Sequence, residues 1–218
     1  MQIDLSDKTV FVTGASRGIG AAIATTLHQA GAMVILHYGR DRDAALQVQG
    51  SLGSERCQLL GMPLDVPGAA QQLWRQAIAL TATNGQTEGQ IDVVVNNAAM
   101  MAAAGVQDDW ATWDQTWNDT LQVNVRAVAD LCRLAITHFQ TRSSAFADPQ
   151  FADPQPAGIL VNLASRAAFR GDGPEYMHYA ASKGAIVALT RTIARGFAAD
   201  GILAYAIAPG FVHTDRIE

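Results

Sequence analysis

Thr13-Gly14-Ala15-Ser16-Arg17-Gly18-Ile19-Gly20 is the stretch from which the fold of this chain can be predicted. The apolar residues 9–12 before it are typical of a buried strand, and residues 19–27 after it favour a helix. The start of a helix presents unpaired N–H groups and a partial positive charge, which favour a bound anion. The three glycines suit a tight turn, a close approach to a pyrophosphate and close helix–strand packing. The stretch therefore predicts a dinucleotide site, although a glycine-rich turn without a ligand shares the local pattern.

Length and charge narrow the classes of function that fit this chain. Its 218 residues suit one α/β domain over residues 1–218, and its net charge of −5 without a basic run disfavours nucleic acid and anionic membrane surfaces as partners. The first residues lack a signal-peptide pattern, and no apolar stretch approaches the length of a membrane span. Cys57 and Cys132 lie far apart in apolar segments, which indicates free thiols. We expect a cytoplasmic protein.

Strand and helix patterns alternate along the whole chain. Strands are predicted at residues 9–12, 33–37, 57–62, 91–95, 158–163 and 202–207, and helices at residues 19–27, 41–52, 68–82, 110–140 and 176–199. The strand cores are apolar without alternation, as in a parallel sheet that helices cover on both faces. The sequence therefore predicts an α/β fold with a doubly wound parallel sheet (Rossmann fold) and a ligand crevice at the carboxyl ends of the strands.

Two segments favour structural roles. The pentapeptide FADPQ at residues 146–150 is repeated at residues 151–155, where its prolines exclude a regular helix. A surface insertion is favoured there over a lid or partner-binding loop. Trp110, Trp113 and Trp117 recur at helical spacing, which favours packing in the core or between subunits over stacking on a ligand.

Tyr179 and Lys183 form the chemical centre of the predicted site. They are four residues apart on one predicted helix and therefore share a face. We expect the lysine to lower the pKa of the tyrosine from its ordinary value near ~10 and to make it a general acid or base. A surface Tyr–Lys pair without function is the structural alternative.

Ser165 and Asn124 are two further polar residues that are candidates for the predicted ligand site. Ser165 follows the strand at residues 158–163, where its hydroxyl would meet a carbonyl or else cap a helix. Asn124 lies on an apolar helix face, and its alternative role is a buried amide bonded to the backbone. His178 and His213 have no metal-ligand company, so no metal site is expected.

These residues occur together in one order with matching spacing. The glycine turn, residues 96–99, Asn124, Ser165, the Tyr179/Lys183 pair and Pro209-Gly210 make the chain resemble the short-chain dehydrogenase/reductase family from about residue 8 to residue 214. The likeness is greatest to 3-oxoacyl-[acyl-carrier-protein] reductases and related carbonyl reductases. It implies hydride transfer between a nicotinamide and a carbonyl or alcohol substrate.

The resemblance also implies a role for each catalytic residue. Tyr179 exchanges the proton, Ser165 orients the substrate oxygen, and Lys183 holds the nicotinamide ribose and tunes Tyr179. Asn124 anchors a water that links Lys183 to solvent. The implied cofactor-binding residues are these two, Tyr179 and Lys183, together with Gly14, Ser16, Arg17, Gly18, Ile19, Gly20, Tyr38, Arg40, Asp65, Val66, Asn97, Ala98, Ala99, Pro209, Gly210, Val212 and Thr214.

Charge favours NADP(H) over NAD(H) as the cofactor. NAD sites in such folds commonly place an acid after the second strand, where this chain has Tyr38, Gly39 and Arg40. The guanidinium groups of Arg17 and Arg40 suit a 2′-phosphate, although Asp41 and Asp43 lie close in sequence.

Two departures from the family pattern affect what is expected. Ala99 replaces the glycine usual after Asn-Asn-Ala, which adds one methyl group near the cofactor. Family members also continue well beyond Pro209-Gly210 with a substrate-covering segment, a helix and a seventh strand, whereas this sequence ends at Glu218. We expect a sheet whose C-terminal strand is missing, either because a tail is absent from the sequence or because the protein is truncated.

The sequence leaves the substrate and assembly open. The leading hypothesis is an NADP(H)-dependent carbonyl reductase or alcohol dehydrogenase that forms a homodimer or homotetramer. A pteridine reductase is one alternative, suggested by insertions at residues 81–90 and 141–157 and by Arg17 with residues 37–40. A cofactor-binding subunit without turnover is the other.

Overall fold

The computed structural model describes residues 3–82, 89–141 and 156–213. The strands are β1 (Thr9–Val12), β2 (Met33–Tyr38), β3 (Cys57–Gly61), β4 (Val93–Asn96), β5 (Gly158–Leu163) and β6 (Ile202–Ile207). The α-helices are α1 (Gly18–Gln29), α2 (Arg42–Leu52), α3 (Ala69–Thr81), α4 (Trp110–Leu121), α5 (Ala127–Gln140), α6 (Ala167–Arg170) and α7 (Met177–Gly196). Shorter helical segments are the π-helix η1 (Gln122–Arg126) and the 3₁₀ helices η3 (Pro174–Tyr176) and η4 (Ala198–Asp200).

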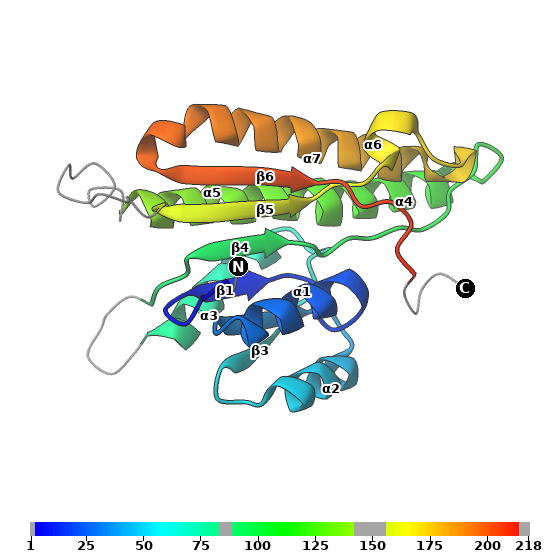
Figure 1. Ribbon diagram of the computed structural model, residues 1–218. Coiled ribbons are helices and arrows are strands. Elements are labelled where there is room, and N and C mark those ends of the chain that lie inside the picture. Colours follow the sequence, from blue (N-terminus) through cyan, green and yellow to red (C-terminus); the bar gives the residue numbers. More distant parts are fainter. Residues whose placement is uncertain (1–2, 83–88, 142–155, 214–218) are drawn as a thin grey trace.

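The described strands form one parallel sheet in the order β3-β2-β1-β4-β5-β6 (Figure 1). From β1 the chain adds β2 and β3 on one side and then β4, β5 and β6 on the other, so the direction of strand addition reverses between β1 and β4, where Phe11 pairs with Val94. Chains that leave neighbouring strands in opposite directions open a crevice at such a point. The predicted doubly wound Rossmann sheet is confirmed, and its crevice lies beside the glycine turn.

Helices cover both faces of the sheet (Figure 1). On one face α3, α5 and α7 pack on a core that includes Phe11, Val94 and Leu160. On the other face α1 and α2 pack on residues that include Val10 and Val12. Consecutive strand residues thus enter opposite cores, which explains why the strands are apolar without alternation.

The helix predicted over residues 110–140 is interrupted. The structure divides it into α4, η1 and α5, because five residues from Gln122 to Arg126 form a π-helical turn. Such a turn adds a residue to the helical repeat and commonly marks a functional position. Here it contains Asn124, which is fully buried.

Other sequence predictions differ only in detail. Asp41 and Asp109 cap α2 and α4, since their carboxylates accept from the Ala44 and Thr112 N–H groups. Trp113 and Trp117 pack together with ring centroids 5.6 Å apart. Trp110 is 79% exposed, so it does not pack in the core of this chain, and its packing between subunits stays a prediction. Both cysteines are buried free thiols.

The last described strand borders solvent. β6 is an edge of the sheet, and on it Leu203, Tyr205 and Ile207 are exposed. Within residues 3–82, 89–141 and 156–213 there is no seventh strand, and no helix is long and apolar enough for a membrane span. The FADPQ repeats lie outside the described residues.

Candidate active site

The glycine turn between β1 and α1 is tightly packed. Gly14 has a φ of +62°, and a Cβ there would lie 2.8 Å from the Ala98 Cα. A Cβ on Gly20 would lie 2.3 Å from the Gly14 carbonyl oxygen and 2.4 Å from Asn97 Nδ2. Gly18 has a φ of +54°. The geometry accounts for glycine at all three positions.

Side chains from neighbouring strands hold this turn. Asn97 Nδ2 donates to the Thr13 and Gly14 carbonyl oxygens at 2.9 Å. Thr13 Oγ1 accepts from the Asn97 and Ala98 N–H groups at 3.0 Å. These contacts join the ends of β1 and β4 and brace the turn through Asn97.

His37 at the end of β2 also holds the turn. Its Nδ1 accepts from the Gly14 N–H at 3.2 Å, and its Nε2 lies 2.7 Å from the Met62 carbonyl oxygen. Accepting at Nδ1 requires the tautomer that carries its proton on Nε2. Burial lowers the pKa of His37 to about 4, so the ring is neutral at pH 7. Sequence reasoning missed this residue and Thr13; a histidine inside an apolar strand was the available signal.

Ser165, Tyr179 and Lys183 meet where β5 ends and α7 begins. Lys183 is 4% exposed and its Nζ donates to the Leu163 carbonyl oxygen at 2.7 Å. The same Nζ lies 5.7 Å from the centroid of the Tyr179 ring. A hydrogen bond also links Tyr179 to Ser165. Ser165 Oγ accepts from the Ala167 N–H at 3.1 Å, so it also stabilises the start of α6.

The expected lowering of the tyrosine pKa is wrong for this structure. Burial raises the pKa of Tyr179, the hydrogen bond with Ser165 lowers it, and the charge of Asp172 raises it further. Burial lowers the pKa of Lys183 to about 8. The lysine does not stabilise a phenolate here, since its Nζ is bonded to the Leu163 carbonyl. The tyrosine is therefore protonated at pH 7.

Asn124 binds the backbone, as its structural alternative predicts. Its Oδ1 accepts from the Met100 N–H at 2.7 Å, and its Nδ2 donates to the Met100 carbonyl at 2.9 Å. Nδ2 also donates to Ser182 Oγ at 3.1 Å, and that hydroxyl donates to the Tyr179 carbonyl at 2.7 Å. The π-helical turn thus ties the segment after β4 to the helix that bears Tyr179.

A cavity of about 190 Å³ joins the glycine turn to the Tyr–Lys pair. Nine predicted site residues line it: Ile19, Asn97, Ala99, Ser165, Tyr179, Lys183, Pro209, Gly210 and Val212. Asn124 lies in η1 and not in the lining, and Thr214 lies outside the described residues. The other predicted cofactor residues are Gly14, Ser16, Arg17, Gly18 and Gly20 in or beside the glycine turn, and five residues near strand ends. Ala98 lies just after β4, Tyr38 and Arg40 lie at and after the end of β2, and Asp65 and Val66 follow β3.

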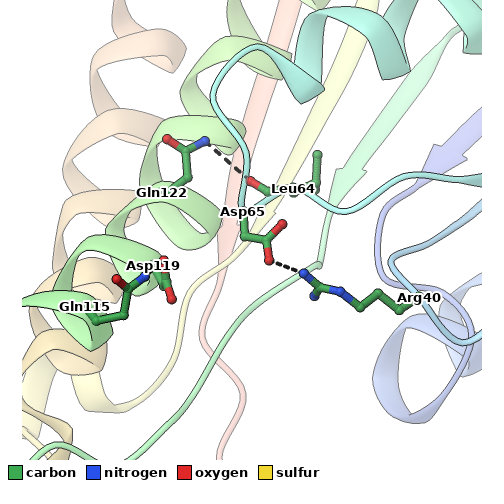
Figure 2. A network of polar contacts seen from close by, with 6 residues as sticks. All are labelled: Arg40, Leu64, Asp65, Gln115, Asp119 and Gln122. Carbon is green, nitrogen blue, oxygen red and sulfur yellow. Dashed lines mark hydrogen bonds and ion pairs between the residues drawn. The ribbon is translucent and has the colours of Figure 1, made fainter. Parts of the chain in front are cut away.

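The ends of β2 and β3 carry two ion pairs. Arg40 donates from Nη2 to Asp65 Oδ2, as Figure 2 shows. Arg17 Nη2 lies 3.7 Å from Asp41 Oδ2. The sequence suggests that both guanidinium groups are available to a phosphate, whereas in the structure each one faces a carboxylate. Asp65 Oδ1 is buried without a hydrogen-bond partner and offers an acceptor beside them.

These features fit a dinucleotide. The open cavity reaches from Ile19 at the start of α1 to Tyr179, and Arg17, Arg40 and the free Asp65 oxygen lie on the side of β2 and β3.

A second hollow of about 570 Å³ is lined by Asp65 and by residues of α4, η1 and α5 that include Asp119 and Arg126.

Comparison with known proteins identifies the family. Residues 8–218 match the family model described as short chain dehydrogenase. The chain is 31% identical over 213 residues to the versicolorin reductase stcU of Emericella nidulans, which is 97% of this chain and 71% of that protein.

Solved structures agree. A 3-oxoacyl (acyl-carrier-protein) reductase from Agrobacterium tumefaciens C58 with NADP bound has a TM-score of 0.81 and 31% identity, over 99% of this chain and 74% of that chain. The RhlG/NADP active-site complex of Pseudomonas aeruginosa has a TM-score of 0.81 and 27% identity, over 99% of this chain and 77% of that chain. With the parallel sheet and the matched family model, these likenesses show that the chain belongs to the short chain dehydrogenase family of oxidoreductases.

Proposed function

We propose that this protein is an NADP(H)-dependent carbonyl reductase or alcohol dehydrogenase with Tyr179 as its general acid and base. The observation that carries the proposal is the shared lining of one cavity. Ser165, Tyr179 and Lys183 line it together with Ile19, at the start of α1, and Asn97, which follows β4. Substrate and cofactor would thus meet in one place.

The chain's own groups account for the proton transfer. A nicotinamide bound in this cavity supplies or accepts the hydride. Tyr179, protonated because burial raises its pKa, donates its proton to the carbonyl oxygen as the alcohol forms. Ser165, hydrogen-bonded to Tyr179, holds the same oxygen. Lys183 lines the cavity while its Nζ donates to the Leu163 carbonyl, and we assign it to hold a ribose hydroxyl of the cofactor.

The proposed preference for NADP(H) rests on charge and on relatives. Arg17 and Arg40 place two cations where a 2′-phosphate would lie, and guanidinium groups bind phosphate in two-point fashion. Structures similar to this chain were solved with NADP.

We further propose that residues 1–218 act as one domain that carries both sites, in a cytoplasmic homodimer or homotetramer. The substrate is a small carbonyl or alcohol. Light scattering after gel filtration measures the number of subunits.

Removal of the Tyr179 hydroxyl tests the proposed chemistry. We expect Tyr179→Phe to bind NADPH with a Kd within about twofold of wild type and to lose at least ~10²-fold in turnover, because proton transfer contributes about that factor. NADPH oxidation is followed with a panel of ketones, 3-oxoacyl thioesters, sugars, steroids and pterins, and binding is followed by NADPH fluorescence.

Phe169→Leu is the matched control, since this exposed side chain lies on α6 outside the cavity lining. It should retain wild-type turnover. Unchanged turnover in Tyr179→Phe would contradict the assigned role. NADPH binding by the wild type without turnover on any substrate would favour the non-catalytic subunit, and turnover only with pterins would favour the pteridine reductase.

A further inference from the structure

The two arginines at the proposed 2′-phosphate site are neutralised by carboxylates of this chain. Arg40 follows β2, and its side chain is 74% exposed, whereas that of its partner Asp65 is only 25% exposed. The side chains of Arg17 and Asp41 are 46% and 41% exposed. The four residues come from the glycine turn and the ends of β2 and β3, and together they carry no net charge.

We propose that Asp65, and to a smaller extent Asp41, are specificity-determining residues that restrain the preference of this site for NADP(H). The inference rests on the proposed cofactor site. A 2′-phosphate carries about two negative charges and has to draw each guanidinium away from its carboxylate. The 2′-hydroxyl of NAD(H) carries no charge and makes no such demand.

The two pairs differ in geometry. Asp65 lies four residues after β3, where Gln122 of η1 donates to the adjacent Leu64 carbonyl at 3.4 Å (Figure 2). Its Oδ2 accepts directly from Arg40, whereas the Arg17–Asp41 separation of 3.7 Å is too long for a hydrogen bond. Asp41 is also occupied as the N-cap of α2, with Oδ1 accepting from the Ala44 N–H at 3.0 Å. Asp65 should therefore hold its arginine more strongly.

Neutral variants of nearly the same shape test this assignment. We expect Asp65→Asn to lower the ratio of the NADPH Kd to the NADH Kd about fivefold, the scale of one exposed ion pair. The ratio is the readout because any contact of Asp65 with the part shared by the two cofactors changes both Kd values equally. Asp41→Asn should lower the NADPH Kd about twofold, and its fold is retained because asparagine caps helices as well as aspartate does. Direct binding is measured by cofactor fluorescence and by titration calorimetry with 2′,5′-ADP and 5′-AMP.

Two controls separate the mechanism from a general change in charge. Asp43→Asn removes a carboxylate from the first turn of α2 that forms no ion pair among the described residues, and it should change neither affinity by more than about 1.5-fold. The second control places Asp65→Asn in an Arg40→Met background. If Asp65 acts through Arg40, the effect of Asp65→Asn on the ratio of the NADPH Kd to the NADH Kd should fall below twofold in this background.

The outcomes are distinct. An unchanged ratio of the NADPH Kd to the NADH Kd in Asp65→Asn, or an equally large change of that ratio in the Arg40→Met background, would overturn the inference while the proposed function stands. A wild-type protein that binds neither NADPH nor NADH would overturn the proposed function as well. A selective gain that depends on Arg40 supports both.

Discussion

His37 is a titratable side chain that holds the glycine turn on which the proposed cofactor site depends. It is 1% exposed, and its neutral ring accepts from Gly14 and donates to Met62. Protonation would replace the acceptor at Nδ1 with a donor that faces the Gly14 N–H. The folded chain therefore resists protonation of this ring.

The stability of the protein should fall in mild acid because of His37. The pKa of a histidine in the unfolded chain is 6.5, and in the folded chain it is lowered to about 4. The unfolded state binds more protons between these values, so the His37 contribution is complete above pH 6.5. It is lost as the pH falls toward 4, by about 3 kcal/mol in all.

Urea unfolding of wild type and His37→Gln between pH 7.5 and 4.5 measures this contribution. The glutamine amide does not titrate in this range. The slope of the unfolding free energy against pH should therefore be steeper for wild type than for His37→Gln, by up to ~1.4 kcal/mol per pH unit. Equal slopes for the two proteins would show that His37 is not held neutral.

At the scale of elements, buried polar contacts connect α7 to the sheet. Asn162 of β5 accepts from Asn96 Nδ2 of β4 at 2.8 Å and donates to Thr190 Oγ1 of α7 at 2.9 Å. All three side chains are at most 2% exposed. Because α7 also carries Tyr179 and Lys183, this chain of contacts helps to set the position of the proposed catalytic pair.

Removal of the Thr190 hydroxyl should weaken this packing. Thr190→Val keeps the shape but leaves a buried N–H of Asn162 without its acceptor, which costs about 1–3 kcal/mol of unfolding free energy. Thr192→Val is the matched control, since Thr192 lies on the same helix and its hydroxyl is exposed, donating to the Ala188 carbonyl within its own helix. The unfolding free energy of Thr192→Val should stay within about 0.5 kcal/mol of wild type. Similar losses in both variants would argue against the buried contact as the cause.

For the whole molecule, the covering of the sheet is uneven. The first three strands have helices on both faces, whereas Leu203, Tyr205 and Ile207 alternate along β6 with their side chains exposed. Alternate residues of a strand point to one face, so these side chains form an apolar strip at an edge of the sheet.

Residues 1–218 should therefore self-associate in a way that depends on this strip. We expect Tyr205→Lys to lower the weight-average mass measured by light scattering at ~100 µM, because a charge on an edge strand opposes pairing. Its circular dichroism spectrum should match wild type. Glu55→Lys, an exposed change outside the strip, should leave the mass unchanged, and an equal mass for all three proteins would exclude the strip from association.

The fold and much of the candidate site follow from local patterns in the sequence. Apolar runs and glycine positions depend on residues within a few places of one another, and they placed all six described strands to within two residues. Spacing along one helix likewise put Tyr179 and Lys183 on a common face, and the order of the fold brought both to the cavity with Ser165. These features are short-range, so the chain determines them by itself.

Contacts between distant segments were decided only by the tertiary structure. The partners of Arg17 and Arg40, the bond from His37 to Gly14 and the Leu163 carbonyl that holds Lys183 come from loops and strands packed side by side. The π-helical turn at Asn124 likewise joins Met100 and Ser182, which lie 24 and 58 residues away. Sequence spacing cannot give the charge state of Tyr179, because its pKa depends on how deeply these segments bury the ring.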